Sequence, residues 1–134
     1  MLFAAASALA LAIACNSSGN PESDEAIVKA DAARPAVTQA VLDRGAQIYK
    51  ANCIACHGES GKGDGPAAGV LKPPPRDHTD RAYMDTMTDD DLKKVIVMGG
   101  AIKGRPLMPS HPQLRGDDLD ALIAFVRSLS TGKG

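Results

Sequence analysis

Cys53-Ile54-Ala55-Cys56-His57 is a C-x-x-C-H sequence, the signal for covalent attachment of c-type haem. If this stretch is helical, residues three and four positions apart share one face, so both cysteines and the histidine address the same flat ligand. The two thiols would add to the two vinyl groups of haem, and the adjacent imidazole would ligate the iron. We therefore predict one haem c per chain, attached through Cys53 and Cys56, with His57 as an iron ligand.

A thioredoxin-like redox dithiol is the alternative that also uses the C-x-x-C spacing. This alternative leaves His57 without a role, and it requires a β-α-β pattern that the neighbouring sequence lacks. Haem that stays with the denatured chain would separate the two hypotheses, because only a covalent cofactor survives denaturation.

The composition supports a small domain built around a large apolar cofactor. The 134 residues contain only 3% aromatic side chains and no tryptophan, which is little material for the core of a small domain. A buried haem would supply the missing core, so we expect folding to depend on it. The net charge of −1 gives no sign of nucleic-acid binding. The glycine-rich stretch 58–69 lacks the full phosphate-loop pattern, so no nucleotide is expected either.

The first 14 residues, MLFAAASALALAIA, carry no charge and are almost entirely apolar. They are too few to span a bilayer, which takes about 20 apolar residues. We interpret residues 1–14 as a secretory signal peptide, so the protein is expected to be exported to the periplasmic side. The positively charged start of such a signal is missing, which leaves open a true start upstream of Met1.

Cys15 directly follows Leu11-Ala12-Ile13-Ala14, and this order resembles the lipobox of bacterial lipoproteins. The resemblance implies that Cys15 is lipidated and anchors the protein to a membrane. The sequence departs from the lipobox pattern at Ala12, where leucine is usual. The alternative is ordinary cleavage near Ala14, with Cys15 as an incidental thiol.

Residues 15–35 are polar and acidic and have no helical apolar stripe. We predict a flexible tether here. A tether of this length has a root-mean-square reach on the order of 25 Å. The folded domain is then expected to cover residues 36–134.

Three helices are expected in that domain, and no strand pattern of useful length occurs. The first runs from about Ala40 into the haem motif and contains Gly45, which we interpret as a site of close helix approach, with a local kink as the alternative. The second covers 88–98, where Thr88 is a good N-cap and Gly99 follows the last residue. The third, at 117–130, has the clearest apolar periodicity.

In these features the chain resembles the class I (monohaem) bacterial cytochromes c over about residues 41–129. The resemblance is carried by six short stretches: Gly45-x-x-x-Tyr49-x-x-x-Cys53, Cys56-His57-Gly58, Gly65-Pro66, Gly99-Gly100, Met108-Pro109 and LIAFVRSL at 122–129. It implies an all-α fold in which three to five short helices wrap around one covalently bound haem.

The resemblance also implies roles for individual residues. His57 would be the proximal ligand and Met108 the distal one. The carbonyl of Pro66 would accept a hydrogen bond from the His57 ring, although Pro73–Pro75 could compete for this role. Gly45 would pack near Phe125, where the first and last helices cross.

Several other side chains could reach the distal side of the iron. The candidates besides Met108 are Met84, Met87, Met98, His78 and His111. Met108 is favoured because it stands in a loop next to Pro109, where a stiff backbone can hold a thioether against iron. His111 is the closest rival, and its alternative role is that of a surface histidine.

The remaining candidates have simpler explanations. Met98 follows Leu92, Val95 and Ile96 on the expected inward face of helix 88–98, so we interpret it as core filler. Met84 and Met87 precede the helix cap and are expected in a loop or in packing. A ligand at His78 would give a bis-histidine haem.

Histidine and methionine together fill both axial positions, so the iron can exchange an electron but has no open site for substrate. We therefore predict a one-electron carrier, not an enzyme, that shuttles electrons between periplasmic or membrane redox partners. Four loop cations are expected to rim the haem edge and steer an acidic partner, or else to be ordinary solvated charge: Lys62, Lys72, Lys103 and Arg105. The alternative function is a haem enzyme or a gas or peroxide sensor with an open sixth position.

Overall fold

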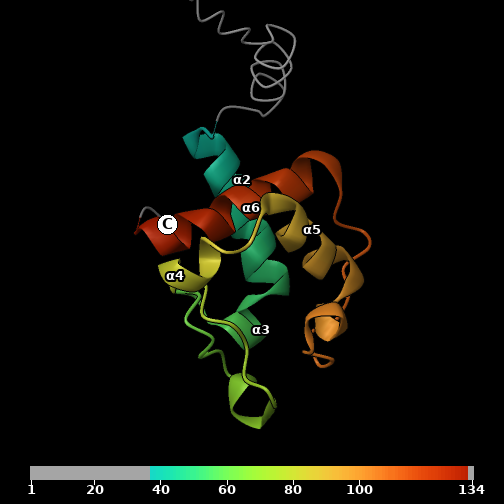
Figure 1. Ribbon diagram of the computed structural model, residues 1–134. Coiled ribbons are helices and arrows are strands. Elements are labelled where there is room, and N and C mark those ends of the chain that lie inside the picture. Colours follow the sequence, from blue (N-terminus) through green and yellow to red (C-terminus); the bar gives the residue numbers. More distant parts are fainter. Residues whose placement is uncertain (1–36, 133–134) are drawn as a thin grey trace, which may run out of the picture. The chain divides into compact units, whose positions relative to one another are not determined.

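The computed structural model describes residues 37–132 (Figure 1). The signal peptide at 1–14, lipidation at Cys15, the tether at 15–35 and the boundary at Ala36 therefore lie outside the described residues. Within 37–132 the chain forms five α-helices, two short 3₁₀ helices and no strand, which confirms the predicted all-α class. No helix in this range is long and apolar enough to cross a membrane.

The helices differ widely in length, and the two longest pack against each other. In chain order they are α2 (Gln39–Asn52), α3 (Ile54–His57), the 3₁₀ helix η1 (Ala68–Val70), α4 (Arg81–Met84), α5 (Asp89–Met98), the 3₁₀ helix η2 (Gly100–Lys103) and α6 (Gly116–Thr131). Figure 1 shows α2 crossing α6, with α5 beside α6. In Figure 1 most of the segment between α3 and α5 lies below this crossing, and the segment between η2 and α6 runs up beside α5.

The crossing of α2 and α6 depends on Gly45. A Cβ atom at this position would lie 2.2 Å from the carbonyl oxygen of Ala121 and 2.7 Å from the Cβ of Phe125. Only glycine lets the two backbones approach this closely. The expected packing of Gly45 near Phe125 is therefore confirmed, and the local-kink alternative is not needed.

Both ends of α5 are set by local sequence. The Thr88 hydroxyl accepts a hydrogen bond from the Asp91 amide at 3.1 Å, and the Asp91 carboxylate accepts one from the Thr88 amide at 3.2 Å. This reciprocal pair is a capping box. At the other end Gly99 has a φ of +86°, which favours glycine. The predicted start and end of this helix are confirmed.

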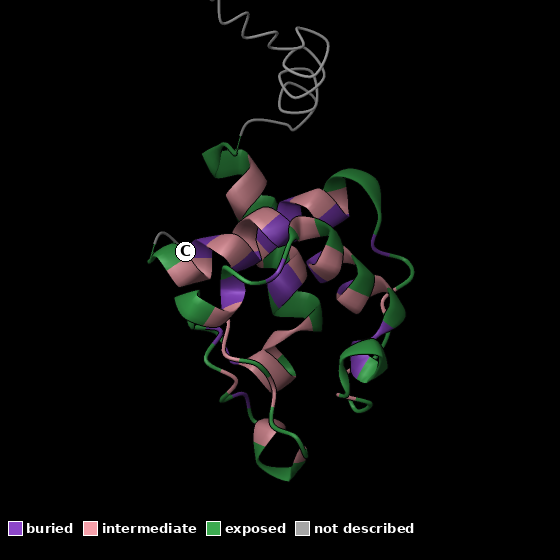
Figure 2. Ribbon diagram, in the orientation of Figure 1, coloured by how far each residue is buried: buried purple, intermediate pink, exposed green. Residues whose placement is uncertain are grey.

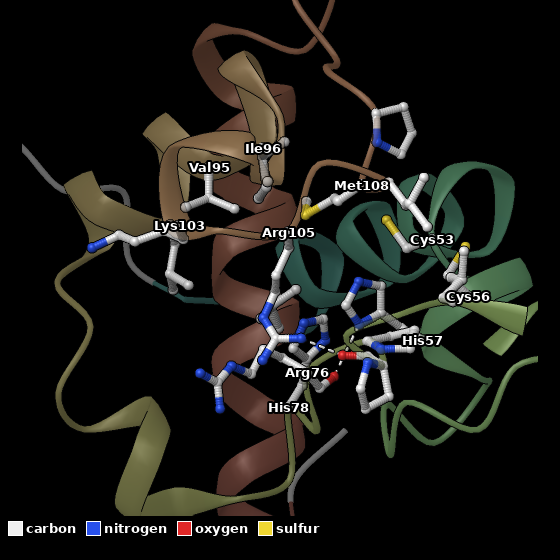
Figure 3. Close-up of a pocket in the computed structure, with 18 of the residues that line it drawn as sticks. Cys53, Cys56, His57, Arg76, His78, Val95, Ile96, Lys103, Arg105 and Met108 are labelled. Carbon is white, nitrogen blue, oxygen red and sulfur yellow. Dashed lines mark hydrogen bonds between the residues drawn. The ribbon is translucent and has the colours of Figure 1, made fainter. Parts of the chain in front are cut away.

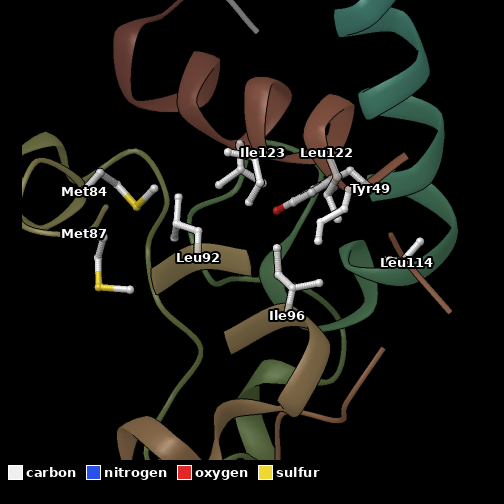
Figure 4. Close-up of a cluster of buried hydrophobic side chains, with 10 residues drawn as sticks. Tyr49, Met84, Met87, Leu92, Ile96, Leu114, Leu122 and Ile123 are labelled. Atoms are coloured by element: carbon white, nitrogen blue, oxygen red, sulfur yellow. The ribbon is translucent and has the colours of Figure 1, made fainter. Parts of the chain in front are cut away.

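The core lies between α5, α6 and the end of α2 (Figures 2 and 4). Its side chains are all at least about nine-tenths buried. They are Tyr49, Met84, Met87, Leu92, Ile96, Leu114, Leu119, Leu122, Ile123 and Val126. Of the two roles expected for Met84 and Met87, a loop position or packing, the structure therefore shows packing. They reach the core because α4 and the turn after it fold back onto α6.

The expectation that Met98 fills the core is wrong, because its side chain is 61% exposed. Leu92 and Ile96 are four positions apart and share the buried face. Met98 is two positions beyond Ile96, which places it about 200° further around the helix axis, on the solvent side.

Arg127 on α6 holds the turn before α5 in place through hydrogen bonds and an ion pair. Its guanidinium donates to the carbonyl of Met84 at 2.6 Å and to that of Met87, and it forms an ion pair with Asp89 at 3.0 Å. One side chain therefore holds the end of α4 and the start of α5 against α6.

Candidate functional site

One cavity gathers residues from almost every element of the described chain. Its lining includes Cys53, Cys56, His57 and Met108, together with apolar side chains from α5 and α6. In Figure 3, Met108 lies on one side of this space and His57 on the other, with the two cysteines at its margin. Met108 is thus brought to the same cavity as Cys53, Cys56 and His57, although it lies far from them in the sequence.

The cysteines and the histidine are presented by a short turn of their own. Helix α2 ends at Asn52, and Cys53 leaves the helical conformation with φ of −121° and ψ of −32°. The Cys53 carbonyl then accepts hydrogen bonds from the amides of Cys56 at 3.2 Å and His57 at 2.9 Å. This turn, continued as α3, places the three side chains on the same side, as the spacing predicts.

The two cysteine side chains are free, partly buried thiols. Burial raises the pKa of the Cys53 thiol to about 11, so this group is neutral near pH 7. Two thiols that line one cavity are suited to form thioether bonds with a flat ligand inside it.

The hydrogen bond of His57 fixes its tautomer. Its Nδ1 atom lies 3.0 Å from the carbonyl oxygen of Arg76. A carbonyl can only accept, so Nδ1 must carry the proton and Nε2 keeps a free lone pair. Burial lowers the pKa of His57, which favours this neutral form. A neutral imidazole with Nε2 free and Nδ1 held by a carbonyl is the usual arrangement of a metal-binding histidine.

The expectation that Pro66 supplies this carbonyl is not met. Pro66 is exposed and is absent from the cavity lining. The acceptor is Arg76, the residue that follows the competing run Pro73–Pro75. Two contacts bring this segment under His57: the His78 amide donates to the Gly61 carbonyl at 2.7 Å, and Gly63, with φ of +76°, packs closely against the Pro75 carbonyl.

Met108 is half-buried in a loop that is closed by its own backbone. The amide of Gly100 donates to the Met108 carbonyl at 3.1 Å, and the amide of Met108 donates to the Arg105 carbonyl at 3.1 Å. A Cβ atom on Gly100 would lie 2.7 Å from the Cβ of Met108, so the loop is tight here. These contacts hold the Met108 backbone beside the cavity, which its side chain lines (Figure 3).

The rival candidates for the distal ligand lie in different places. Met98 is absent from the cavity lining, and Met84 and Met87 line it from within the core. His111 also lines the cavity, and its amide donates to the Ile96 carbonyl at 2.9 Å. His78 lies against His57, so it shares the proximal side and not the opposite one.

The charged side chains that line the cavity are all basic. They are Lys72, Arg76, Lys103 and Arg105, and no aspartate or glutamate of residues 37–132 joins them. Arg105 donates to the Pro74 carbonyl across the cavity, and the Arg76 guanidinium stacks over the Tyr83 ring at 4.1 Å. Burial, followed by repulsion from Arg76, lowers the pKa of Arg105.

Three of the four predicted rim cations therefore line the cavity, whereas Lys62 does not. Arg76 was not predicted from the sequence. Its position directly after three prolines was the available signal, since such a stiff segment holds the next residue in a defined place.

Residues 42–130 match the family model described as Cytochrome c. The chain is 39% identical over 94 residues to lupanine 17-hydroxylase (cytochrome c) of Pseudomonas sp, and 29% identical over 93 residues to cytochrome c oxidase subunit 2 of Alkalihalophilus pseudofirmus. Each match covers 69% of this chain, but only 12% and 27% of the respective relatives.

Proposed function

The chain belongs to the cytochrome c family, and from this premise we propose that it is a one-electron carrier whose haem iron is ligated by His57 and Met108. Family membership means covalently bound haem c with its iron, and electron transfer based on that haem. The observation that carries the proposed ligand pair is the shared cavity, with the free Nε2 of His57 and the thioether of Met108 on its two sides.

The residues around the cavity fit haem c in shape and chemistry. Apolar side chains of α5 and α6 suit the macrocycle, and the thiols of Cys53 and Cys56 suit its two vinyl groups. Haem also carries two propionate groups. The basic lining, with Arg76 and Arg105 near each other, would offset these negative charges.

When bound, haem supplies an iron that gains or loses one electron reversibly. His57 and Met108 would hold the iron, and each is already placed at the cavity by the backbone around it, so little in the chain would have to move. A methionine ligand also raises the reduction potential relative to a second histidine. The apolar side chains that line the cavity would limit the access of water to a haem held there.

The partners would be an electron donor and an electron acceptor with an acidic docking face. Lys72 and Lys103 are exposed at the cavity edge, beside the 55% exposed side chain of Leu107. Lys103 also pairs with Asp91 at 3.7 Å, which leaves Lys72 as the less compensated of the two. Such a surface supports a small, transient contact guided by charge.

We place the protein on the periplasmic side of a membrane, with Cys15 as the lipid anchor and residues 15–35 as the tether. This part of the proposal rests on the sequence alone. The tether would let the haem domain reach partners within the same membrane surface.

The alternative is a haem enzyme or a sensor with an open sixth position. This alternative is considered because the two relatives are named as a hydroxylase and an oxidase subunit. However, the shared segment is a small part of each relative, and within the described residues no carboxylate lines the cavity to serve as an acid or base. These facts favour the carrier.

Visible spectroscopy of protein made in a host that attaches haem tests the proposal. We expect a sharp low-spin reduced spectrum and, in the ferric form, the weak far-red band of a sulfur ligand. A high-spin spectrum that changes with carbon monoxide would instead support the enzyme or sensor. Absence of covalent haem would overturn the proposal altogether.

A further inference from the structure

His78 stacks face to face on His57. The two ring centroids are 4.2 Å apart, and the ring planes differ by 18°. His78 is partly buried and lines the same cavity as His57.

His78 is itself held firmly in place. Its amide donates to the Gly61 carbonyl at 2.7 Å, and its Nδ1 lies 3.5 Å from the hydroxyl of Tyr49, a buried residue. Gly61 has a φ of +78°, and a Cβ atom there would lie 3.3 Å from the Cβ of His78. The ring therefore has the core on one side and His57 on the other.

The hydrogen bond to Arg76 and the stack on His78 constrain His57 in different ways. The bond from Nδ1 fixes one point of the imidazole. With Nε2 on the iron, the ring could still turn about the axis between these two contacts. A parallel ring at stacking distance resists this rotation, because turning would drive the two faces into each other.

We propose that His78 is a positioning residue that fixes the plane of the His57 imidazole relative to the haem. The proposal rests on the proposed function, in which His57 is an axial ligand. The orientation of that plane decides how the imidazole π electrons overlap with the iron d orbitals. It therefore influences both the reduction potential and the magnetic anisotropy of the ferric haem.

The test compares His78→Phe, which keeps a flat ring, with His78→Leu, which keeps apolar volume but no flat face. The readouts are the spread of the haem-methyl proton shifts in the ferric protein and the reduction potential. We expect His78→Leu to change the spread and to lower the potential, since a loosened site admits water that stabilises the ferric charge. His78→Phe should restore both towards the wild-type values.

Should His78→Leu yield no holoprotein, His78→Asn serves in its place. Asparagine keeps a polar group near the Tyr49 hydroxyl but cannot cover the imidazole face, so we expect the same change as for leucine. Wild-type shift patterns in the variants without a ring would overturn the proposal. Equal changes in the Phe and Leu variants would also overturn it, because they would assign the effect to the polar nitrogen or to general packing.

Failure of the proposed function would look different. It would appear in the wild-type protein itself, as missing covalent haem or as a spectrum without histidine and methionine ligation. A normal wild-type spectrum together with unaltered His78 variants would overturn only the role of His78.

Discussion

At the scale of single residues, Met108 carries the sharpest consequence of the proposed ligand pair. Its loop is closed by backbone hydrogen bonds from Gly100 and to Arg105, so the backbone of Met108 is held beside the cavity that its side chain lines. A side chain placed in this way can bind iron with little loss of conformational freedom.

Met108→Leu should therefore leave haem attached, because both thiols and His57 remain. The far-red ferric band should disappear, the reduction potential should fall, and the reduced protein should bind carbon monoxide. Visible spectra of both oxidation states measure this. His111→Leu is the matched variant at the rival ligand. If His111→Leu changes the visible spectrum and Met108→Leu leaves it unchanged, the assignment of Met108 as the ligand is wrong.

At the scale of elements, the capping box of α5 makes stability depend on pH. The hydrogen bonds from the side chain and amide of Thr88 lower the pKa of Asp91 below its ordinary value of 3.8. A carboxylate whose pKa is lowered by folding stabilises the folded state above the ordinary pKa, and this stabilisation is lost as the pH falls through the folded pKa.

Asp91→Asn should therefore lower the free energy of unfolding at pH 7, and its difference from the wild type should shrink as the pH falls below 3.8. Denaturant unfolding of both proteins at pH 7 and at acid pH checks this. Asp90→Asn is the control, since Asp90 lies in the same first turn but takes no part in the capping box. An equal loss in both variants would assign the effect to the helix dipole instead.

The crossing of α2 and α6 gives a second prediction at this scale. Gly45→Ala places a methyl group against the Ala121 carbonyl and Phe125, so it should destabilise the protein by about 1–3 kcal/mol, despite the better helix propensity of alanine. Gly69→Ala meets no atom within 4 Å and serves as the control. The two variants should differ clearly in their denaturation midpoints, and equal midpoints would contradict the close-contact argument.

At the scale of the whole molecule, the hydrophobic core and the cavity proposed to hold haem share side chains. Tyr49, Met84, Leu92 and Leu122 belong to the buried cluster and also line the cavity. Without haem in that cavity, these core side chains would be exposed to water. With so few aromatic side chains elsewhere, the chain has little else to bury.

The double variant Cys53→Ser/Cys56→Ser should therefore yield little folded protein. Circular dichroism and resistance to protease, compared with the wild-type holoprotein, measure the loss. Substituting both thiols removes only two small groups, so a large effect would come from the missing cofactor. A stable helical domain without haem would contradict the argument that the cofactor completes the core.

The proposed membrane anchor also belongs to this scale. Cys15→Ser should release the protein from the membrane fraction while leaving haem content and spectrum unchanged, because residues 15–35 separate the anchor from the haem domain. Fractionation of cells that produce each form gives the answer. Unchanged membrane association would exclude Cys15 as the anchor.

Much of the architecture was predictable because it depends on local sequence. The all-α class, both ends of α5 at Thr88 and Gly99, and the helix of 117–130 follow from capping residues and apolar periodicity, which act over one or two turns. The error at Met98 is of the same local kind, since one residue near a helix end was assigned to the wrong face.

The sequence by itself was enough to predict the chemistry of the attachment site, because Cys53, Cys56 and His57 lie within five residues and one short turn presents all three. Only the tertiary structure decided what surrounds them. Arg76, not Pro66, holds the His57 ring, and His78 stacks on it. The physical reason is distance along the chain. Which carbonyl and which ring meet His57 depends on how a loop some 20 residues later folds back under it, and neither spacing nor periodicity records that.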